Sequence, residues 1–151
     1  MFRTRLNESL KEAMKAREQA TVSTLRLILA ALKDRDIAAR SKGISDGIAE
    51  DEILEMLQKM VRQRHDSIEM YQKGERPDLV EKEAAEIEII ERFLPKQLDE
   101  EEILGAVGEV IGELDASSIK DMGRVMSALK ERYAGRMDFG RASAMAKDKL
   151  T

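Results

Sequence analysis

Apolar residues recur at intervals of three and four along most of this chain, the spacing that places side chains on one face of an α-helix. Turn-forming residues divide this pattern into four stretches before Pro95 and three after it. The first predicted helix ends near residues 17–19, and the second begins with Thr21 or Ser23 as its N-cap. The pattern therefore predicts an all-helical chain.

Each of the first four predicted helices has an apolar side. In the first helix this side is formed by Leu6, Leu10, Ala13 and Met14. The second helix is apolar nearly all round over residues 24–33, so we expect it at the centre of an N-terminal bundle. The third runs from about residue 50 to residue 73 and ends at Gly74. The fourth begins at Pro77 and ends at Pro95.

Residues 96–98 are predicted to form a short hinge before three C-terminal helices. Asp99 followed by Glu102 is typical of the N-cap of a helix. This fifth helix has apolar residues on one side and three glycines on the other, namely Gly105, Gly108 and Gly112. Such glycines mark either close contact with a partner or a helix of low intrinsic stability, and the sequence leaves both interpretations open.

The sixth predicted helix has the most distinctive surface. One side is apolar, and the other carries Lys120, Gly123, Arg124, Ser127 and Lys130. A glycine at this place exposes backbone between cations, which suits close approach by a phosphate or by another backbone. The alternative is a weakly specified helix with a solvated face.

Caps and turns delimit the last two helices. Ser117 or Ser118 is predicted to cap the sixth helix, and Asp138 the seventh. A turn at residues 135–137 joins them.

These elements predict an all-α fold in two parts. Residues 1–96 would form a four-helix bundle-like subdomain, and residues 97–151 a small three-helix C-terminal subdomain. Composition agrees, because Ala, Leu, Ile, Met, Glu, Lys and Arg dominate while the chain has only two prolines and five aromatic residues.

Charge is unevenly distributed along the chain. The net charge is +5 over residues 1–42, −6 over 43–97, −7 over 98–115 and +4 over 116–151, within an overall charge of −4. The overall charge argues against a general nucleic-acid binder, whereas the basic ends permit a local anionic partner.

Other features of the composition concern location. The chain has no cysteine, so disulfides and thiol chemistry are excluded. The most apolar run, residues 25–32, is too short to cross a bilayer and contains Arg26, so we expect no membrane association. The first residues resemble a mitochondrial presequence superficially, but Glu8 and Glu12 follow at once. A cytoplasmic location is therefore predicted.

Residues suited to catalysis are scarce. His65 is the only histidine, and no glycine-rich phosphate loop is present, so we predict no catalytic residue, no metal site and no cofactor. Arg26, Arg64 and Glu86 are charged residues within otherwise apolar stretches. We interpret them as an interhelical ion-pair network, with a functional role as the alternative.

Several motifs together carry a family resemblance. They read T-L-R-L at residues 24–27, R-P-D-L at 76–79, F-L-P at 93–95 and K-D-M-G-R-V-M at 120–126, the last followed by G-R at 135–136. These motifs resemble the YqeY family, small proteins related to the C-terminal region of the GatB subunit of tRNA-dependent amidotransferases. The motif at residues 120–126 is similar to the GatB tail, and the resemblance covers essentially the whole chain.

The resemblance implies an N-terminal helical bundle and a C-terminal three-helix subdomain. It also implies carbon–nitrogen ligase activity with glutamine as amido-nitrogen donor. Its implied partners are tRNA and an aminoacyl-tRNA synthetase or amidotransferase subunit. An amidotransferase needs a phosphate site and a metal site, which this sequence lacks. The matching role is therefore a non-catalytic tRNA-binding or aminoacylation-assisting module.

In such a module the basic C-terminal residues would bind RNA. The phosphate contacts would come from Lys120, Arg124, Lys130 and Arg136, with Gly123 and Ser127 on the same face and Arg141, Lys147 and Lys149 widening the positive surface. Two other hypotheses stay open. One is a protein–protein adaptor that uses the glycine side of the fifth helix and the acidic fourth helix. The other is an accessory component of a tRNA amidotransferase.

Overall fold

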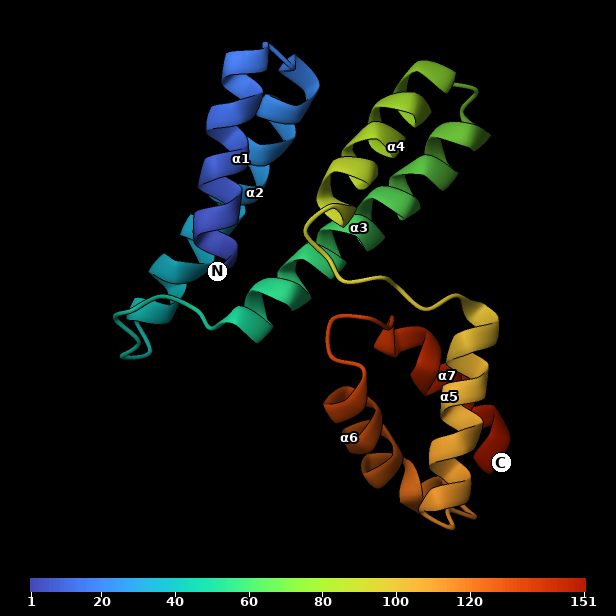
Figure 1. Cartoon of the computed structure of the whole chain (residues 1–151). Coiled ribbons are helices and arrows are strands. Elements are labelled where there is room, and N and C mark those ends of the chain that lie inside the picture. The colour runs from blue at the N-terminus through green and yellow to red at the C-terminus, as the bar shows by residue number, and fades with distance from the viewer. The chain divides into compact units, whose positions relative to one another are not determined.

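The computed structural model describes all 151 residues, which form two compact units, Met1–Leu94 and Pro95–Thr151. The sequence placed the corresponding boundary after residue 96. Figure 1 shows the helices, with no strand among them, which confirms the predicted all-α class. The N-terminal unit contains α1 (Phe2–Ala16), α2 (Gln19–Arg40), α3 (Glu50–Lys73) and α4 (Pro77–Glu91). The C-terminal unit contains α5 (Glu100–Glu113), the short 3₁₀-helix η1 (Ile119–Asp121), α6 (Met122–Arg132) and α7 (Phe139–Leu150).

The N-terminal unit consists of two helical hairpins, α1–α2 and α3–α4 (Figure 1). As predicted, α2 is central, because it packs against α1, α3 and α4. The core is built from the apolar stripes of all four helices. Its fully buried large side chains are Leu6, Leu25, Ile28, Ile53, Met56, Leu57 and Ile90.

The start of α2 differs from the prediction. It begins at Gln19, without a side-chain cap, and Thr21 and Ser23 lie inside the helix. The reason is that Arg17 takes a left-handed conformation with φ 58°, which ends α1 and reverses the chain within two residues. Met14, which the pattern places on the apolar side of the first helix, is 51% exposed and does not belong to the core.

The ends of the second hairpin are mostly set by local sequence. Gly74 is the C-cap of α3, and Pro77 is the first residue of α4, as predicted. However, α4 ends at Glu91, before the predicted stop at Pro95. The intervening residues form tight turns, in which the Phe93 and Leu94 amides donate to carbonyls three residues earlier.

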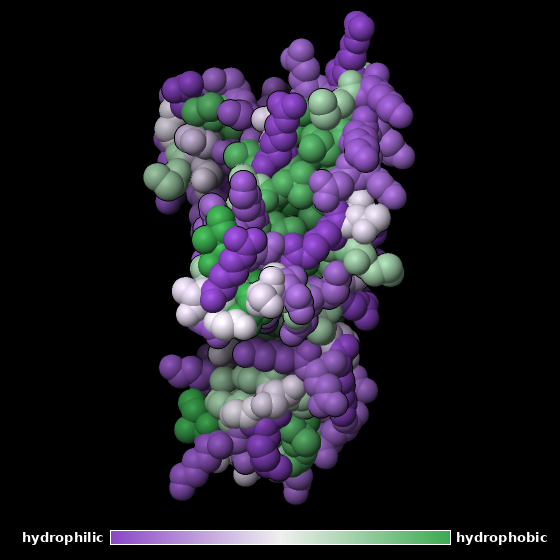
Figure 2. Space-filling view, turned by 90° about the vertical axis from the view of Figure 1, so that its left-hand side faces the viewer, coloured by the Kyte–Doolittle hydropathy of each residue, from purple (hydrophilic) through white to green (hydrophobic).

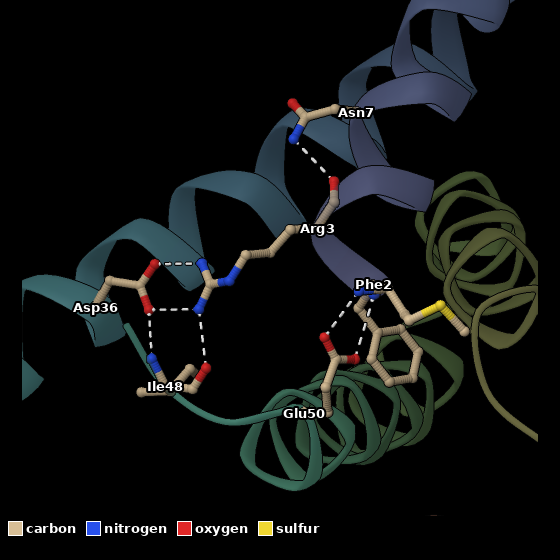
Figure 3. Close-up of polar contacts among 7 residues, drawn as sticks. Phe2, Arg3, Asn7, Asp36, Ile48 and Glu50 are labelled. Atoms are coloured by element: carbon tan, nitrogen blue, oxygen red, sulfur yellow. Dashed lines mark hydrogen bonds and ion pairs between the residues drawn. The ribbon is translucent and has the colours of Figure 1, made fainter. Parts of the chain in front are cut away.

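A polar network fastens the loop between α2 and α3 (Figure 3). The Arg3 guanidinium donates to Asp36 Oδ1 at 3.0 Å and to the Ile48 carbonyl at 2.9 Å. Asp36 Oδ1 also accepts from the Ile48 amide at 2.9 Å. The hydrogen bond from Arg3 is the main cause that lowers the pKa of Asp36 below its ordinary value. Gly47, with φ +87°, lets the backbone pass this cluster.

In the C-terminal unit, α5, α6 and α7 pack against one another around a separate core. Its buried residues are Ile103, Ala106, Val107, Val110, Val125, Leu129, Met137, Ala142, Ala146 and Leu150. The predicted capping box of α5 is confirmed, since Asp99 accepts from the Glu102 amide at 2.8 Å and Glu102 accepts from the Asp99 amide at 3.2 Å.

Residues 96–98 are not a free hinge, in contrast to the prediction. The Gln97 side-chain amide donates to the Gly135 carbonyl at 2.6 Å, and the Leu98 amide donates to the Arg136 carbonyl at 2.8 Å. The segment is therefore held by the turn that precedes α7. A hydrogen bond between residues 38 positions apart in the chain cannot be predicted from the pattern of neighbouring residues.

Candidate functional site

The polar face of α6 begins at a well-ordered helix start. Ser118 precedes η1, which leads directly into α6. Asp121 Oδ2 accepts from the amides of Ser117 at 3.0 Å and Ser118 at 3.3 Å. The hydrogen bond from the Ser117 amide, followed by those from Arg124 and from the Ser118 amide, lowers the pKa of Asp121. Asp121 thus holds the start of the helix that presents the predicted RNA-binding residues.

Four of those residues line one exposed face. Lys120 of η1 and Gly123, Ser127 and Lys130 of α6 are all exposed, and they follow one another at intervals of three and four residues. Val125 and Leu129, on the opposite side of α6, are fully buried in the core. A Cβ atom at Gly123 would meet nothing within 4 Å, so packing within the chain does not require a glycine there. The α6 face, as we call these four residues, is open cationic surface with bare backbone near its start.

The other predicted arginines are engaged by neighbours. Arg124 pairs with Asp121 at 2.9 Å, and Arg141 pairs with Glu100 at 3.6 Å. The Arg136 Nε donates to the Lys96 carbonyl at 3.3 Å, which directs this side chain to the linking segment. By contrast, Lys120 and Lys130 form no ion pair. The lysines of the α6 face therefore carry its free positive charge.

The predicted residues of α7 do not simply extend the α6 face. Lys147 and Lys149 are exposed, and a Cβ built at Gly108 would lie 2.9 Å from the Lys149 Nζ. Lys149 therefore reaches over α5. The glycine side of α5 is consequently interrupted, because Gly108 is covered by Lys149 whereas Gly105 and Gly112 face open space.

The predicted ion-pair network contains two of its three members. Arg64 Nε contacts Glu86 Oε2 at 2.7 Å, with both side chains largely buried, and Arg64 also donates to the Met60 carbonyl at 3.0 Å. Arg26 does not join them. It is exposed on α2 and forms no ion pair, because the side of α2 on which it lies is not covered by another helix.

No three His, Asp or Glu side chains come together as a metal site would need. His65 is exposed on α3. Tyr133 and Phe139, the aromatic residues nearest to the α6 face in sequence, pack partly buried against the C-terminal core. None of the helices combines the length and apolarity that crossing a bilayer demands.

Comparison with protein families gives one match that spans nearly all of the chain. The YqeY-like protein family matches residues 3–150. The chain belongs to the YqeY-like protein family. The family resemblance read from the motifs is thereby confirmed, whereas the GatB-related part of that interpretation stays a prediction.

Curated relatives of this YqeY-like chain include fungal proteins named "Altered inheritance of mitochondria protein 41, mitochondrial". The protein of Lachancea thermotolerans is 36% identical over 115 residues, which cover 75% of this chain and 59% of the relative. That of Kluyveromyces lactis is 34% identical over 115 residues, covering 74% and 60%. That of Candida glabrata is 36% identical over 89 residues, covering 59% and 47%. The chain thus spans about 60% or less of the length of these relatives.

The names of these relatives correct one prediction. They are named as mitochondrial proteins, which contradicts a plain cytoplasmic assignment for this chain. The prediction rested on early acidic residues and on the absence of a long apolar run. Neither property distinguishes the cytosol from the mitochondrial matrix, because both compartments hold water-soluble helical proteins.

Proposed function

We propose that the C-terminal unit of this YqeY-like chain is a non-catalytic tRNA-binding module that contacts the phosphate backbone through the α6 face. The observation that carries the proposal is the exposed row of Lys120, Gly123, Ser127 and Lys130, in which neither lysine has an acidic partner. Unpaired lysines beside a bare backbone suit phosphate oxygens, since both bring donors or positive charge close to an anion.

The half-buried positions of Tyr133 and Phe139 bear on the mode of binding. Recognition of single-stranded RNA depends largely on bases stacked on aromatic side chains. Both aromatic rings near the α6 face pack against the core instead. The module therefore recognises the shape and backbone of a folded RNA rather than its sequence. This mode fits an aminoacylation-assisting role, or an accessory role beside an amidotransferase that supplies the catalytic sites.

The test is binding of the full-length chain to unfractionated tRNA at several salt concentrations. Lys120→Ala/Lys130→Ala should weaken binding and lower the slope of log affinity against log salt by about 2. Lys73→Ala/Lys82→Ala removes two other exposed lysines, from α3 and α4, and serves as the matched control. Salt-insensitive binding, or equal losses in the two double variants, would overturn the proposal.

A variant that adds bulk without changing charge tests whether RNA approaches Gly123 closely. Gly123→Leu leaves every charge in place, and a Cβ at Gly123 meets nothing within 4 Å, so the fold tolerates it. Its side chain would nevertheless hold a phosphate backbone away from α6. We expect tRNA affinity to fall with an unchanged or higher melting temperature, because leucine favours helix over glycine. Unchanged affinity would show that RNA does not approach Gly123.

A further inference from the structure

The α1–α2 hairpin leaves apolar side chains in contact with water. Met14, Leu27 and Ile37 are 51%, 46% and 50% exposed, and Val22 and Leu29 of α2 are partly buried. We call these five residues the α2 seam. Figure 2, seen from the side on which α1 and α2 lie in Figure 1, shows apolar surface between hydrophilic side chains in the N-terminal unit.

The α2 seam is hollowed rather than flat. A hollow of about 640 Å³ is lined by Met14, Val22 and Leu27 at the α1–α2 turn. Another, of about 270 Å³, is lined farther along α2 by Leu29 and Ile37, together with the Arg3–Asp36 pair. Open hollows with apolar walls accept protruding apolar side chains, as the spaces between side chains do in helix packing.

A row of cations lines the walls of the two hollows. Arg26, Lys33 and Arg40 follow one another at intervals of seven residues on α2. Seven residues make nearly two helical turns, so these side chains lie on one side of α2 at steps of about 10 Å. All three are exposed and none forms an ion pair. Arg17 adds a further cation at the wall of the larger hollow.

The acids of α2 offset this charge only in part. Asp36 accepts from Arg3 and from the Ile48 amide, and it also attracts Arg40, which helps to lower its pKa. Asp34 is exposed, but it follows Lys33 by one residue and so points about 100° away from the row of cations. The seam therefore combines an apolar hollow with a positive edge of helical periodicity.

We propose that the α2 seam docks an acidic amphipathic helix of a partner protein. Leucine-like side chains of that helix fill the two hollows, and carboxylates at seven-residue spacing face Arg26, Lys33 and Arg40. This is the arrangement by which charged edges beside an apolar seam choose a partner in helix pairs. The charge of the seam makes the partner acidic.

Other occupants match the seam less well. Two copies of this chain paired through α2 would set cations against cations, which is repulsive in either orientation. A bilayer surface needs an unbroken apolar face, whereas Arg26, Lys33 and Arg40 lie among the apolar side chains at the walls of the hollows. RNA phosphates gain nothing from the exposed Leu27 and Ile37.

The probe is a blocked three-heptad peptide of about 21 residues, with leucine on one face and glutamate at the flanking positions. Its counterpart has lysine in place of every glutamate. Anisotropy of the labelled peptides measures binding to the full-length chain, and amide chemical shifts locate the contact. We expect saturable binding of the glutamate peptide, with shifts in α1 and α2, and no binding of the lysine peptide.

Matched variants test the row of cations. Arg26→Glu/Lys33→Glu/Arg40→Glu should weaken the glutamate peptide at least about tenfold, because three attractions become repulsions. The control reverses three exposed lysines of α3 and α4, Lys59→Glu/Lys73→Glu/Lys82→Glu, and should leave affinity within about twofold. Leu27→Asp, a single change at an exposed position, should also weaken binding. It provides the test if the triple variant does not fold.

Three results would overturn the proposal. They are equal binding of the two peptides, chemical shifts confined to the C-terminal unit, and loss of affinity in both triple variants alike. Binding of phosphatidylserine-containing vesicles that the Arg26→Glu/Lys33→Glu/Arg40→Glu variant loses, without peptide binding, would assign the seam to a membrane instead. The tRNA assay is independent of these results, because it depends on residues of the other unit.

Discussion

The Arg64–Glu86 pair offers the sharpest test of what holds the N-terminal unit together. It joins α3 to α4 at 2.7 Å, and the two side chains are only 13% and 12% exposed. In Glu86→Ala, the Arg64 guanidinium would keep its bond to the Met60 carbonyl but lose its only carboxylate. A charge left without its partner in a largely dry position is costly.

The expected magnitude lies between two limits. Removing one partner of a fully buried ion pair costs about 3–5 kcal/mol, and exposed pairs contribute about 0–1 kcal/mol. Because both side chains retain a little exposure, we expect Glu86→Ala to cost about 2–3 kcal/mol. At about 4–8 °C per kcal/mol for a unit of this size, the melting temperature of the N-terminal unit falls by about 10–20 °C.

The matched control is Glu88→Ala on the same helix. Glu88 pairs with Arg92 at 3.5 Å, but the two side chains are 75% and 53% exposed. Its loss should change stability by less than about 1 kcal/mol. Urea unfolding combined with amide hydrogen exchange in α3 and α4 measures the N-terminal unit directly.

A double variant tests whether the cost of Glu86→Ala comes from leaving Arg64 without its carboxylate partner. Arg64→Met/Glu86→Leu replaces both charges by apolar side chains and should lie within about 1 kcal/mol of the wild type. The reasoning fails if Glu86→Ala is no more destabilising than Glu88→Ala. It also fails if the double variant is at least as destabilised as Glu86→Ala.

Two further predictions concern the network at the loop between α2 and α3. Gly47→Ala should lower the free energy of unfolding more than Gly43→Ala. Both glycines have φ near +86°, where a side chain costs about 1–2 kcal/mol of backbone strain. Only at Gly47 would the new Cβ also lie 2.7 Å from Arg3 and 2.9 Å from Asp36. Equal urea midpoints for the two variants would contradict the steric argument. Because the folded-state pKa of Asp36 is lowered, its stabilising effect is complete above the ordinary carboxyl pKa and is lost as pH falls through the lowered folded value. The stability difference between wild type and Asp36→Asn should therefore shrink below about pH 4, and a difference constant from pH 7 to pH 3 would refute this.

Features that depend on a few neighbouring residues were read correctly from the sequence. The Asp99–Glu102 capping box, the end of α3 at Gly74 and the start of α4 at Pro77 all agree with the structure. In each case the cause is local. A cap bonds to an amide three residues away, and proline restricts its own φ and lacks an N–H.

Predictions that depend on which sides of a helix are covered by another helix were less accurate. Arg26 is predicted to join an ion-pair network because it lies in an apolar run, and Met14 is predicted to lie on the apolar side of the first helix. Both are exposed. Periodicity states which residues share a side of a helix, but not how many sides another helix covers. The same limit concealed the α2 seam.

The sequence by itself determined the helices, most of their ends, the all-α class and the membership of the YqeY-like family. Only the tertiary structure decided that Arg64 meets Glu86, that Gln97 is bound by Gly135, and that Lys149 covers Gly108. The physical reason is the distance along the sequence over which each kind of interaction acts. Helix formation is governed by side chains within about four residues of one another. Contacts between helices depend instead on crossing geometry and on which apolar surfaces are left for a partner to cover.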